Sequence, residues 1–235
     1  MGILNGTGSI IDDWLELSPR GKPPYYQHKI SANELFSRKE AIADTADCLS
    51  QCYQKIHHNW YVANERGNSK PSRQNWRWKQ HLELSSKNQS PELILERKIV
   101  SQGGDNWSNQ MPVASGVVGS SSDKRAAVDL VHKNGGNEFK FIELKVESNT
   151  PLFAAIEILF YGLLFIWSKN NMHELDYDIE EQPVLAASKL ELCVLAPPQY
   201  YKKYDSENLI QALNRGLIEF EYSRDLDVTF YFENL

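Results

Sequence analysis

The sequence predicts an α/β protein in which helices flank a mixed central β-sheet. From residue 90 onward the segments follow the order helix, three strands, helix, strand, helix, strand, which is typical of a mixed sheet with helices on its faces. The segment FKFIELKV (139–146) has the apolar content of a strand that is covered on both faces. Since 41% of the 235 residues are hydrophobic, such a sheet can build a sizeable core.

Residues 1–85 are expected to form a helical, basic extension that precedes an α/β domain over residues 86–235. Ser31 and Glu34 form a capping box, and apolar residues continue after them at helical spacing. A long helix is therefore expected over about residues 32–60. The polar and basic stretch that follows it is either a loop or a short edge hairpin.

Two helices of the α/β domain have clear start signals. Ser90 is a suitable N-cap before Pro91, which predicts a helix to about residue 102. Thr150 and Pro151 begin an apolar helix to about residue 168 in the same way. Its apolar run has 16 residues and contains a glutamate. At about 1.5 Å per residue this run falls short of a roughly 30 Å bilayer core, so we expect a buried helix of a soluble protein.

The remaining segments complete the sheet. The turn NGGN joins two of the strands in a hairpin, and a further helix precedes the last strand. The expected strands are 111–119, 126–132, 139–146, 190–197 and 226–233, and the further helix is 206–217.

Charge and cysteine content limit the class of protein. The net charge of −6 argues against a general nucleic-acid binder. Residues 54–100 nevertheless carry nine Lys/Arg against four Asp/Glu, and residues 171–235 five against thirteen, so one region could meet polyanions. The three cysteines suggest neither a disulfide framework nor a zinc site, and no secretory signal is seen. A cytoplasmic protein without a membrane partner is expected.

Charged residues interrupt two of the apolar strands. Glu143 and Lys145 lie two apart in the strand 139–146 and therefore share a face, and an unpaired charge there would cost several kcal/mol. Asp129 is the charged residue within AAVDLV. If residue 133 pairs with residue 139, Asp129 lies opposite Glu143 on one face; pairing 133 with 138 would separate the two carboxylates. Two carboxylates beside a lysine suit Mg²⁺ or Mn²⁺, which take oxygen ligands and assist phosphoryl chemistry.

These residues resemble the PD-(D/E)xK, or restriction-endonuclease-like, nuclease superfamily. AAVDLV supplies Asp129, IELK supplies Glu143 and Lys145, and the element order matches an α-β-β-β-α-β core. The resemblance implies that Asp129, Glu143 and the Leu144 carbonyl bind metal while Lys145 helps to activate water. It also implies a glutamate from the first core helix, for which Glu96 is the first candidate and Glu92 the second.

The helix after the lysine shows a further partial match. One branch of the superfamily carries Q-x-x-x-Y there, whereas this chain has Glu157 and Tyr161 at that spacing. Val128 stands where the family name has proline. The E-x-K pattern also occurs twice elsewhere in the chain, so the strand context selects Glu143 and Lys145. A buried ion-pair cluster is the structural alternative for these charges, and core packing is the alternative for Tyr161.

A basic aromatic segment is the candidate nucleic-acid contact. Aromatic rings and cations suit both single strands and duplex backbones. Tryptophans that pack the N-terminal helix onto the core would give the same pattern. The candidate contacts are Arg73, Trp76, Arg77, Trp78 and Lys79.

The sequence thus predicts a Mg²⁺- or Mn²⁺-dependent nuclease, with DNA as the expected substrate. Two alternatives remain open: a non-catalytic nucleic-acid-binding or assembly protein that keeps the fold, and an acidic protein that mimics nucleic acid. A homodimer is compatible with each of them.

Overall fold

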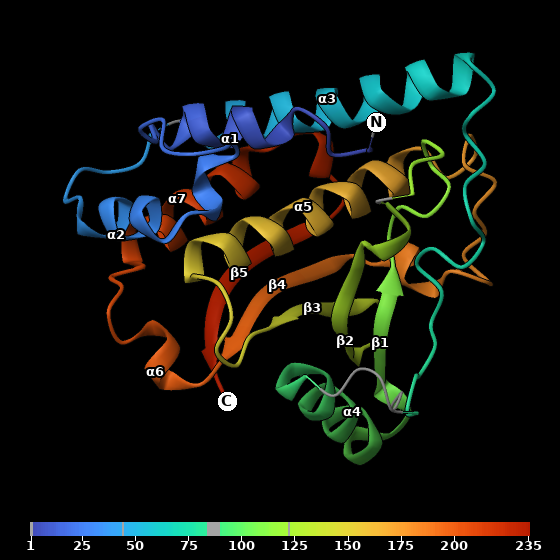
Figure 1. Ribbon diagram of the computed structural model, residues 1–235. Coiled ribbons are helices and arrows are strands. Elements are labelled where there is room, and N and C mark those ends of the chain that lie inside the picture. The colour runs from blue at the N-terminus through green and yellow to red at the C-terminus, as the bar shows by residue number, and fades with distance from the viewer. Residues whose placement is uncertain (1, 44, 84–89, 122) are drawn as a thin grey trace.

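A five-stranded mixed sheet forms the centre of the molecule in the computed structural model, which describes residues 2–43, 45–83, 90–121 and 123–235 (Figure 1). The strands lie in chain order, so neighbours in sequence are also neighbours in the sheet. The first three pair antiparallel, and the last two join in parallel. The strands are β1 (Trp107–Pro112), β2 (Ala127–Gly135), β3 (Glu138–Leu144), β4 (Lys189–Ala196) and β5 (Asp227–Asn234).

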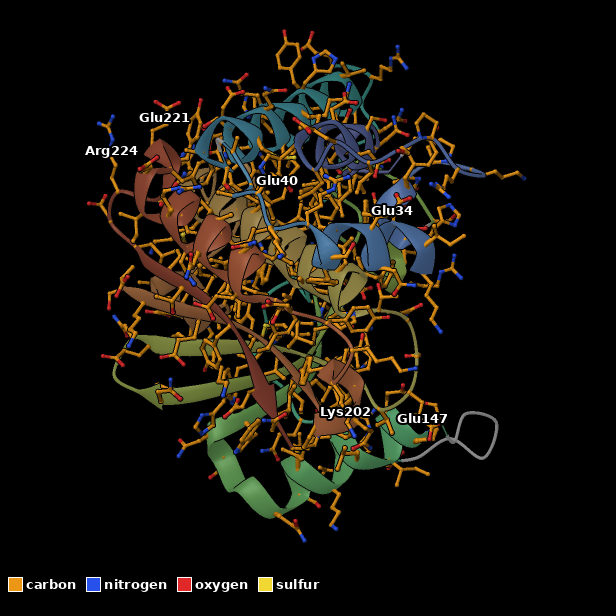
Figure 2. The ribbon with its side chains drawn as sticks, turned by 90° about the vertical axis from the view of Figure 1, so that its left-hand side faces the viewer. Glu34, Glu40, Glu147, Lys202, Glu221 and Arg224 are labelled. Carbon is orange, nitrogen blue, oxygen red and sulfur yellow. The ribbon has the colours of Figure 1, made fainter. Side chains whose placement is uncertain are left out.

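Helices cover the two faces of the sheet unequally. The apolar helix α5 (Pro151–Asn170) and helix α7 (Glu207–Glu219) pack on one face, and α1 (Thr7–Trp14) and α3 (Thr45–Glu65) lie over them (Figures 1 and 2). Helix α4 (Pro91–Gly103) packs on the opposite face, next to β1 (Figure 1). Two further helices, α2 (Lys29–Ser37) and the short α6 (Pro198–Tyr201), lie at one end of the molecule.

The main core includes side chains from both the N-terminal extension and the α/β segment. Ile11 of α1 and Ile56 of α3 are fully buried in the same cluster as Phe141 of β3 and Phe165 of α5. Helix α5 is long and apolar enough to cross a membrane by length and composition, yet most of it is buried inside the protein. This burial is consistent with the soluble α/β protein that the sequence predicts.

The predicted helix starts in the α/β segment are confirmed. The Ser90 hydroxyl accepts a hydrogen bond from the Leu93 amide at 3.2 Å, and Thr150 caps α5 through the Phe153 amide at the same distance. Each cap satisfies one of the free amides at a helix N-terminus.

The long N-terminal helix predicted over 32–60 is wrong. The chain forms α2 and α3 instead, and α1 precedes them where no helix was predicted. Arg38 ends α2 in an extended conformation because its guanidinium binds the carbonyls of Leu15 and Glu16 at 2.7 and 3.0 Å. Ser31 lies inside α2 and does not cap it.

The first strand is shifted from its predicted place at 111–119. Strand β1 spans Trp107–Pro112, and residues 113–118 form bends and a turn. Gly116 has a φ of 78°, and a Cβ there would lie 2.1 Å from the Lys70 carbonyl oxygen, so the segment folds tightly against the chain before α4.

Candidate active site

The β2–β3 hairpin brings Asp129 and Glu143 together. Lys133 pairs with Phe139 and Val131 with Phe141, which is the register that places Asp129 opposite Glu143. The hairpin is irregular nearer its turn, but this does not alter that register. One oxygen of Asp129, Oδ2, accepts a hydrogen bond from the Leu144 amide at 3.0 Å. Glu143 shares a face with Phe141, which packs against α5, so the two carboxylates lie on the α5 side of the sheet.

Lys145 connects this strand pair to α5. Its amide donates to the Leu195 carbonyl at 3.0 Å, which fixes the backbone beside the end of β4. Its Nζ donates to Glu143 Oε1 at 2.5 Å and to Glu157 Oε2 at 3.1 Å. The Lys145 side chain is 9% exposed and that of Glu157 is 26% exposed. The lysine is therefore held between a buried carboxylate and one that reaches solvent.

Helix α4 contributes Glu96. Its Oε1 accepts hydrogen bonds from Asn109 Nδ2 at 2.6 Å and from Arg97 Nη1 at 2.9 Å. Its Oε2 accepts from Gln110 Nε2 at 2.6 Å, and the same nitrogen lies 3.4 Å from Asp129 Oδ1. Gln110 thus bridges the carboxylates of α4 and β2.

Gln110 occupies a strained backbone position beside the site. Its φ of 49° is left-handed, which is uncommon for a residue other than glycine. It stands between the paired residues Asn109 and Met111 of β1, on the side of Asp129. Such conformations persist where the surroundings fix them, and they gather at functional sites.

Glu92, the second candidate on α4, lies outside this group. Its Oε1 accepts from the Ser148 hydroxyl at 2.9 Å and from the Val146 amide at 3.4 Å. It ties the start of α4 to the turn after β3. Of the two glutamates, Glu96 is the one that reaches Asp129 through Gln110.

Tyr161 lies one turn after Glu157 on α5 and is buried. Burial raises the pKa of its phenol, and the negative charges of Glu157 and Glu143 raise it further. The predicted spacing therefore does place both α5 residues beside the strand carboxylates. Because Glu157 binds Lys145, it acts here as an acceptor for a cation rather than as the neutral amide of the Q-x-x-x-Y pattern.

Burial and mutual repulsion raise the pKa values of the carboxylates. Burial raises the pKa of Glu143 well above its usual range, with Asp129 and Glu157 adding to the effect. Burial also raises the pKa of Asp129, and it raises that of Glu96 to about 7. Burial alone would lower the pKa of Lys145, but the charges of Glu143 and Glu157 outweigh it and the pKa is raised. The lysine therefore stays a cation.

The carboxylates suit a hard divalent cation. With every group ionised, the four acids at positions 96, 129, 143 and 157 face two cations, Lys145 and Arg97, which leaves a net charge of −2. Glu143 Oε2 is buried, and a protonated Glu143 can donate a hydrogen bond to Asp129, which lowers the pKa of Asp129. A search of the described residues finds no group of three or more His, Cys, Asp or Glu side chains that could hold a metal ion. Mg²⁺, however, is often bound through one or two carboxylates, and Asp129 and Glu143 are two carboxylates on one face of the hairpin.

The tryptophans of the basic segment pack in the protein rather than facing solvent. Trp76 is 0% exposed, stacks on Phe141 at 5.9 Å and meets Phe165 edge-on. Its predicted contact with nucleic acid is therefore wrong in this structure, and the alternative of core packing holds. Trp78 is half-buried, lies edge-on to Phe139, and donates to the Asp105 carbonyl at 3.3 Å.

The basic side chains of that segment are exposed. Arg73 forms an ion pair with Asp176 at 2.7 Å, while Arg77 and Lys79 face solvent. The backbone around Lys79 runs along β1, where its carbonyl accepts from Ser108 Oγ at 2.6 Å. The segment is an irregular chain along the sheet edge, as the loop alternative predicted.

Sequence reasoning missed Tyr200. It lies on α6, which begins two residues after β4, at the strand end where Leu195 accepts the Lys145 amide. Its hydroxyl oxygen is buried without a hydrogen-bond partner in the described chain. Burial raises its pKa; the charge of Lys145 lowers it and that of Glu143 raises it. The adjoining prolines at 197 and 198 signal the end of a strand and the start of a helix, but nothing in the sequence signals the site.

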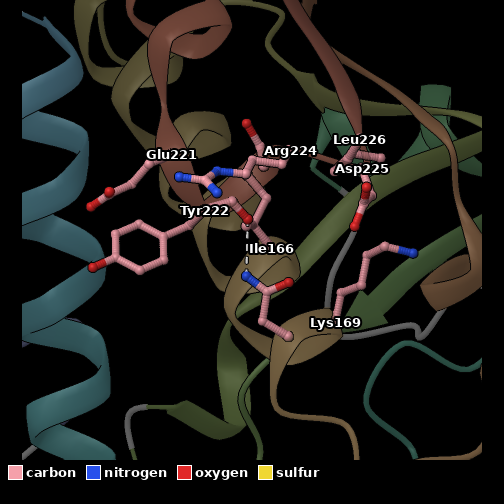
Figure 3. Close-up of a pocket in the computed structure, with 9 residues that line it drawn as sticks. Ile166, Lys169, Glu221, Tyr222, Arg224, Asp225 and Leu226 are labelled. Atoms are coloured by element: carbon pink, nitrogen blue, oxygen red, sulfur yellow. Dashed lines mark hydrogen bonds between the residues drawn. The ribbon is translucent and has the colours of Figure 1, made fainter.

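The cavity shown in Figure 3 is remote from this group. Its volume is about 360 Å³, and Lys169, Tyr222 and Arg224 are among the residues that line it. Lys169 lies twelve positions after Glu157 on α5, which is about 18 Å at 1.5 Å per residue. None of Glu96, Asp129, Glu143 and Glu157 lines this cavity.

No protein-family model, curated protein or solved structure matches this chain. The resemblance to PD-(D/E)xK nucleases therefore rests on the residues of the β2–β3 hairpin and of helices α4 and α5.

Proposed function

We propose that this protein is a divalent-metal-dependent nuclease of the PD-(D/E)xK, restriction-endonuclease-like type that hydrolyses phosphodiester bonds, with DNA as the first substrate to test. The observation that carries the proposal is the convergence of Asp129, Glu143 and Lys145 at one end of the β2–β3 hairpin. A structural ion-pair cluster would explain the lysine, but it gives no reason to place Asp129 beside Glu143, whose pKa burial and the charge of Asp129 raise well above its usual range.

Asp129 and Glu143 are the residues that would hold Mg²⁺ or Mn²⁺, with the Leu144 carbonyl as a further oxygen. A divalent cation held there would polarise a phosphoryl oxygen and lower the pKa of a bound water. Glu96 of α4 would complete the site. The Gln110 amide nitrogen that donates to Glu96 at 2.6 Å also lies 3.4 Å from Asp129.

Lys145 acts as a fixed cation in this proposal. Its raised pKa keeps it protonated, so it donates hydrogen bonds and offsets the charge that develops on the phosphate. In hydrolysis a bond forms between the water oxygen and phosphorus, and the bond from phosphorus to the leaving oxygen breaks. Glu157, which is bonded to Lys145 and partly exposed, accepts the proton that the water loses, and the leaving oxygen takes one from solvent.

One observation favours a second candidate, a nucleic-acid-binding protein without catalysis. Lys145 already binds both Glu143 and Glu157, so the lysine partly neutralises the buried acid without any metal. That function predicts nucleic-acid binding that is indifferent to divalent cations and to the loss of Glu143.

Cleavage assays separate the two candidates. The purified protein is incubated with single- and double-stranded DNA and RNA in Mg²⁺, Mn²⁺ or chelator, beside Asp129→Asn and Lys145→Met. The proposal expects cleavage of at least one polymer that requires metal and falls about 100-fold or more in each variant. Cleavage in chelator, or undiminished cleavage by either variant, would contradict it.

A further inference from the structure

The hydroxyl of Tyr200 needs an explanation that the folded chain does not provide. Buried polar atoms are normally hydrogen-bonded, and each exception points to strain, function or a missing partner. The Tyr200 oxygen is buried and has no partner in the part of the chain that the structure describes. Leaving a buried hydroxyl in this state carries a free-energy cost. A bound ligand with an acceptor oxygen would remove that cost.

The residues around Tyr200 hold it in place. Tyr201 donates from its hydroxyl to the Val194 carbonyl at 2.8 Å and lies 3.2 Å from that of Glu233, which anchors α6 to β4 and β5. The rings of Tyr200 and Tyr201 meet edge-on at 5.3 Å. Tyr204, just after α6, packs against Phe36 at 5.1 Å. These contacts anchor α6 to the sheet, and the Tyr200 ring is held through its contact with Tyr201.

The position of α6 places this hydroxyl beside the candidate active site. Helix α6 follows β4 at the strand end where the Lys145 amide binds Leu195. The charged groups that act on the Tyr200 hydroxyl are Lys145, Glu143 and Glu157, together with the phenol of Tyr204. Figure 2 shows Lys202, which follows α6, at the same end of the molecule as Glu147, two residues after Lys145. Lys202 and Lys203 are both exposed there.

We infer that Tyr200 is a substrate-binding residue: when a nucleic-acid strand docks, the side chains that cover the hydroxyl move aside, and the hydroxyl donates a hydrogen bond to a phosphate oxygen of the strand. This inference rests on the proposed nuclease function and names a contact for it. A neutral donor suits the task because the surrounding carboxylates repel a phosphate and a phenolate would add to that repulsion. Lys202 and Lys203, which are exposed at the same end of the molecule, supply cations for the strand.

The test compares two conservative variants on one helix turn. Tyr200→Phe removes the unpartnered hydroxyl, and Tyr201→Phe removes a hydroxyl that is bonded to backbone carbonyls. For each full-length protein one measures urea unfolding in chelator, affinity for labelled DNA and RNA oligonucleotides in Ca²⁺ by anisotropy, and cleavage kinetics in Mg²⁺.

Tyr200→Phe is expected to unfold at the same or higher urea concentration than wild type while its affinity and its kcat/KM fall about 10- to 100-fold, as for loss of a hydrogen bond to a charged group. Tyr201→Phe should unfold at lower urea but keep wild-type affinity. Equal binding by Tyr200→Phe and wild type overturns the inference, as does a loss of binding that merely follows a loss of stability. If the wild type binds but does not cleave, the nuclease proposal fails while the Tyr200 contact is still decided by binding. If the wild type neither binds nor cleaves, both fail.

Discussion

Replacing Glu96 with glutamine should change how the stability of the metal-free protein depends on pH. Glu96 is 2% exposed, and burial raises its pKa to about 7 from a usual value of 4.5. The folded protein therefore keeps a proton on this group over a range in which the unfolded chain has lost it. Its contribution to stability is complete below pH 4.5 and is lost as the pH rises through 7.

The size of the effect follows from the shift. At about 1.4 kcal/mol per pKa unit, ionising Glu96 in the folded state costs on the order of 3 kcal/mol above pH 7. A glutamine at position 96 cannot ionise, so this cost disappears. Part of the resulting stabilisation is lost again, because the glutamine amide nitrogen would face the Gln110 nitrogen that now donates to Glu96. We expect Glu96→Gln to stabilise the metal-free protein at pH 8 by about 1–3 kcal/mol and to change little at pH 5.

Urea unfolding with chelator at pH 5 and pH 8 measures this difference, and Glu92→Gln is the matched control. Partial burial raises the pKa of Glu92, but hydrogen bonds from its own amide, from Ser148 and from Val146 outweigh burial and lower it. Loss of Glu92 should therefore destabilise the protein at pH 8, the opposite sign to loss of Glu96. Equal pH dependence for wild type and Glu96→Gln would refute the electrostatic account of this site.

Three further predictions concern the site and the core. Mn²⁺ should raise the melting temperature of the wild type more at pH 8 than at pH 5, because the metal competes with protons for the carboxylates. An equal rise in the melting temperature of Glu143→Gln would show that the metal binds elsewhere. Trp76→Ala should lower the free energy of unfolding by about 3–5 kcal/mol, while the exposed Arg77→Ala should change it little; a mild effect at Trp76 would contradict its core position. Lys145→Met leaves buried Glu143 without its cation and should lower the free energy of unfolding by about 3 kcal/mol at pH 8 and by less at pH 5. Lys140→Met is the control, because its partner Glu233 is 42% exposed. In the same urea titration at pH 8, Lys140→Met should lower the free energy of unfolding by less than Lys145→Met does.

Local signals account for the parts of the fold that the sequence predicts. The Ser90–Pro91 and Thr150–Pro151 caps mark helix starts through a few neighbouring residues, and the NGGN turn marks the hairpin. The break between α2 and α3 depends on Arg38, whose guanidinium binds carbonyls more than twenty residues earlier. Such a contact cannot be inferred from helical spacing.

Strand β1 shows the same limit. Half of its residues, Ser108, Asn109 and Gln110, are polar, and the chain beside the strand provides hydrogen-bond partners for Ser108 and Asn109. Asn109, for example, accepts from the His81 amide at 2.7 Å and donates to its carbonyl at 3.0 Å. Contacts with the neighbouring chain therefore place the strand at Trp107–Pro112, a few residues before the apolar stretch that predicted it.

Some residues of the candidate site could be predicted from the sequence, and others could not. Asp129, Glu143 and Lys145 could be found because charges stand out in apolar strands, and the 133–139 pairing then brings them together. Gln110 could not be found because its role comes from a left-handed backbone between two acids. Tyr200 could not be found because its significance is an unpartnered oxygen, which exists only in the folded chain.

The measurement that tests the central claim most directly is the rate of Mg²⁺-dependent DNA cleavage by Glu143→Gln beside Glu138→Gln. Both residues lie on β3, but Glu138 is exposed at the hairpin turn, whereas Glu143 is 3% exposed beside Asp129. We predict cleavage that depends on Mg²⁺ in the wild type and in Glu138→Gln and that is reduced at least about 100-fold in Glu143→Gln. Equal cleavage by the two variants, or cleavage that persists in chelator, would contradict a metal-dependent nuclease at this site.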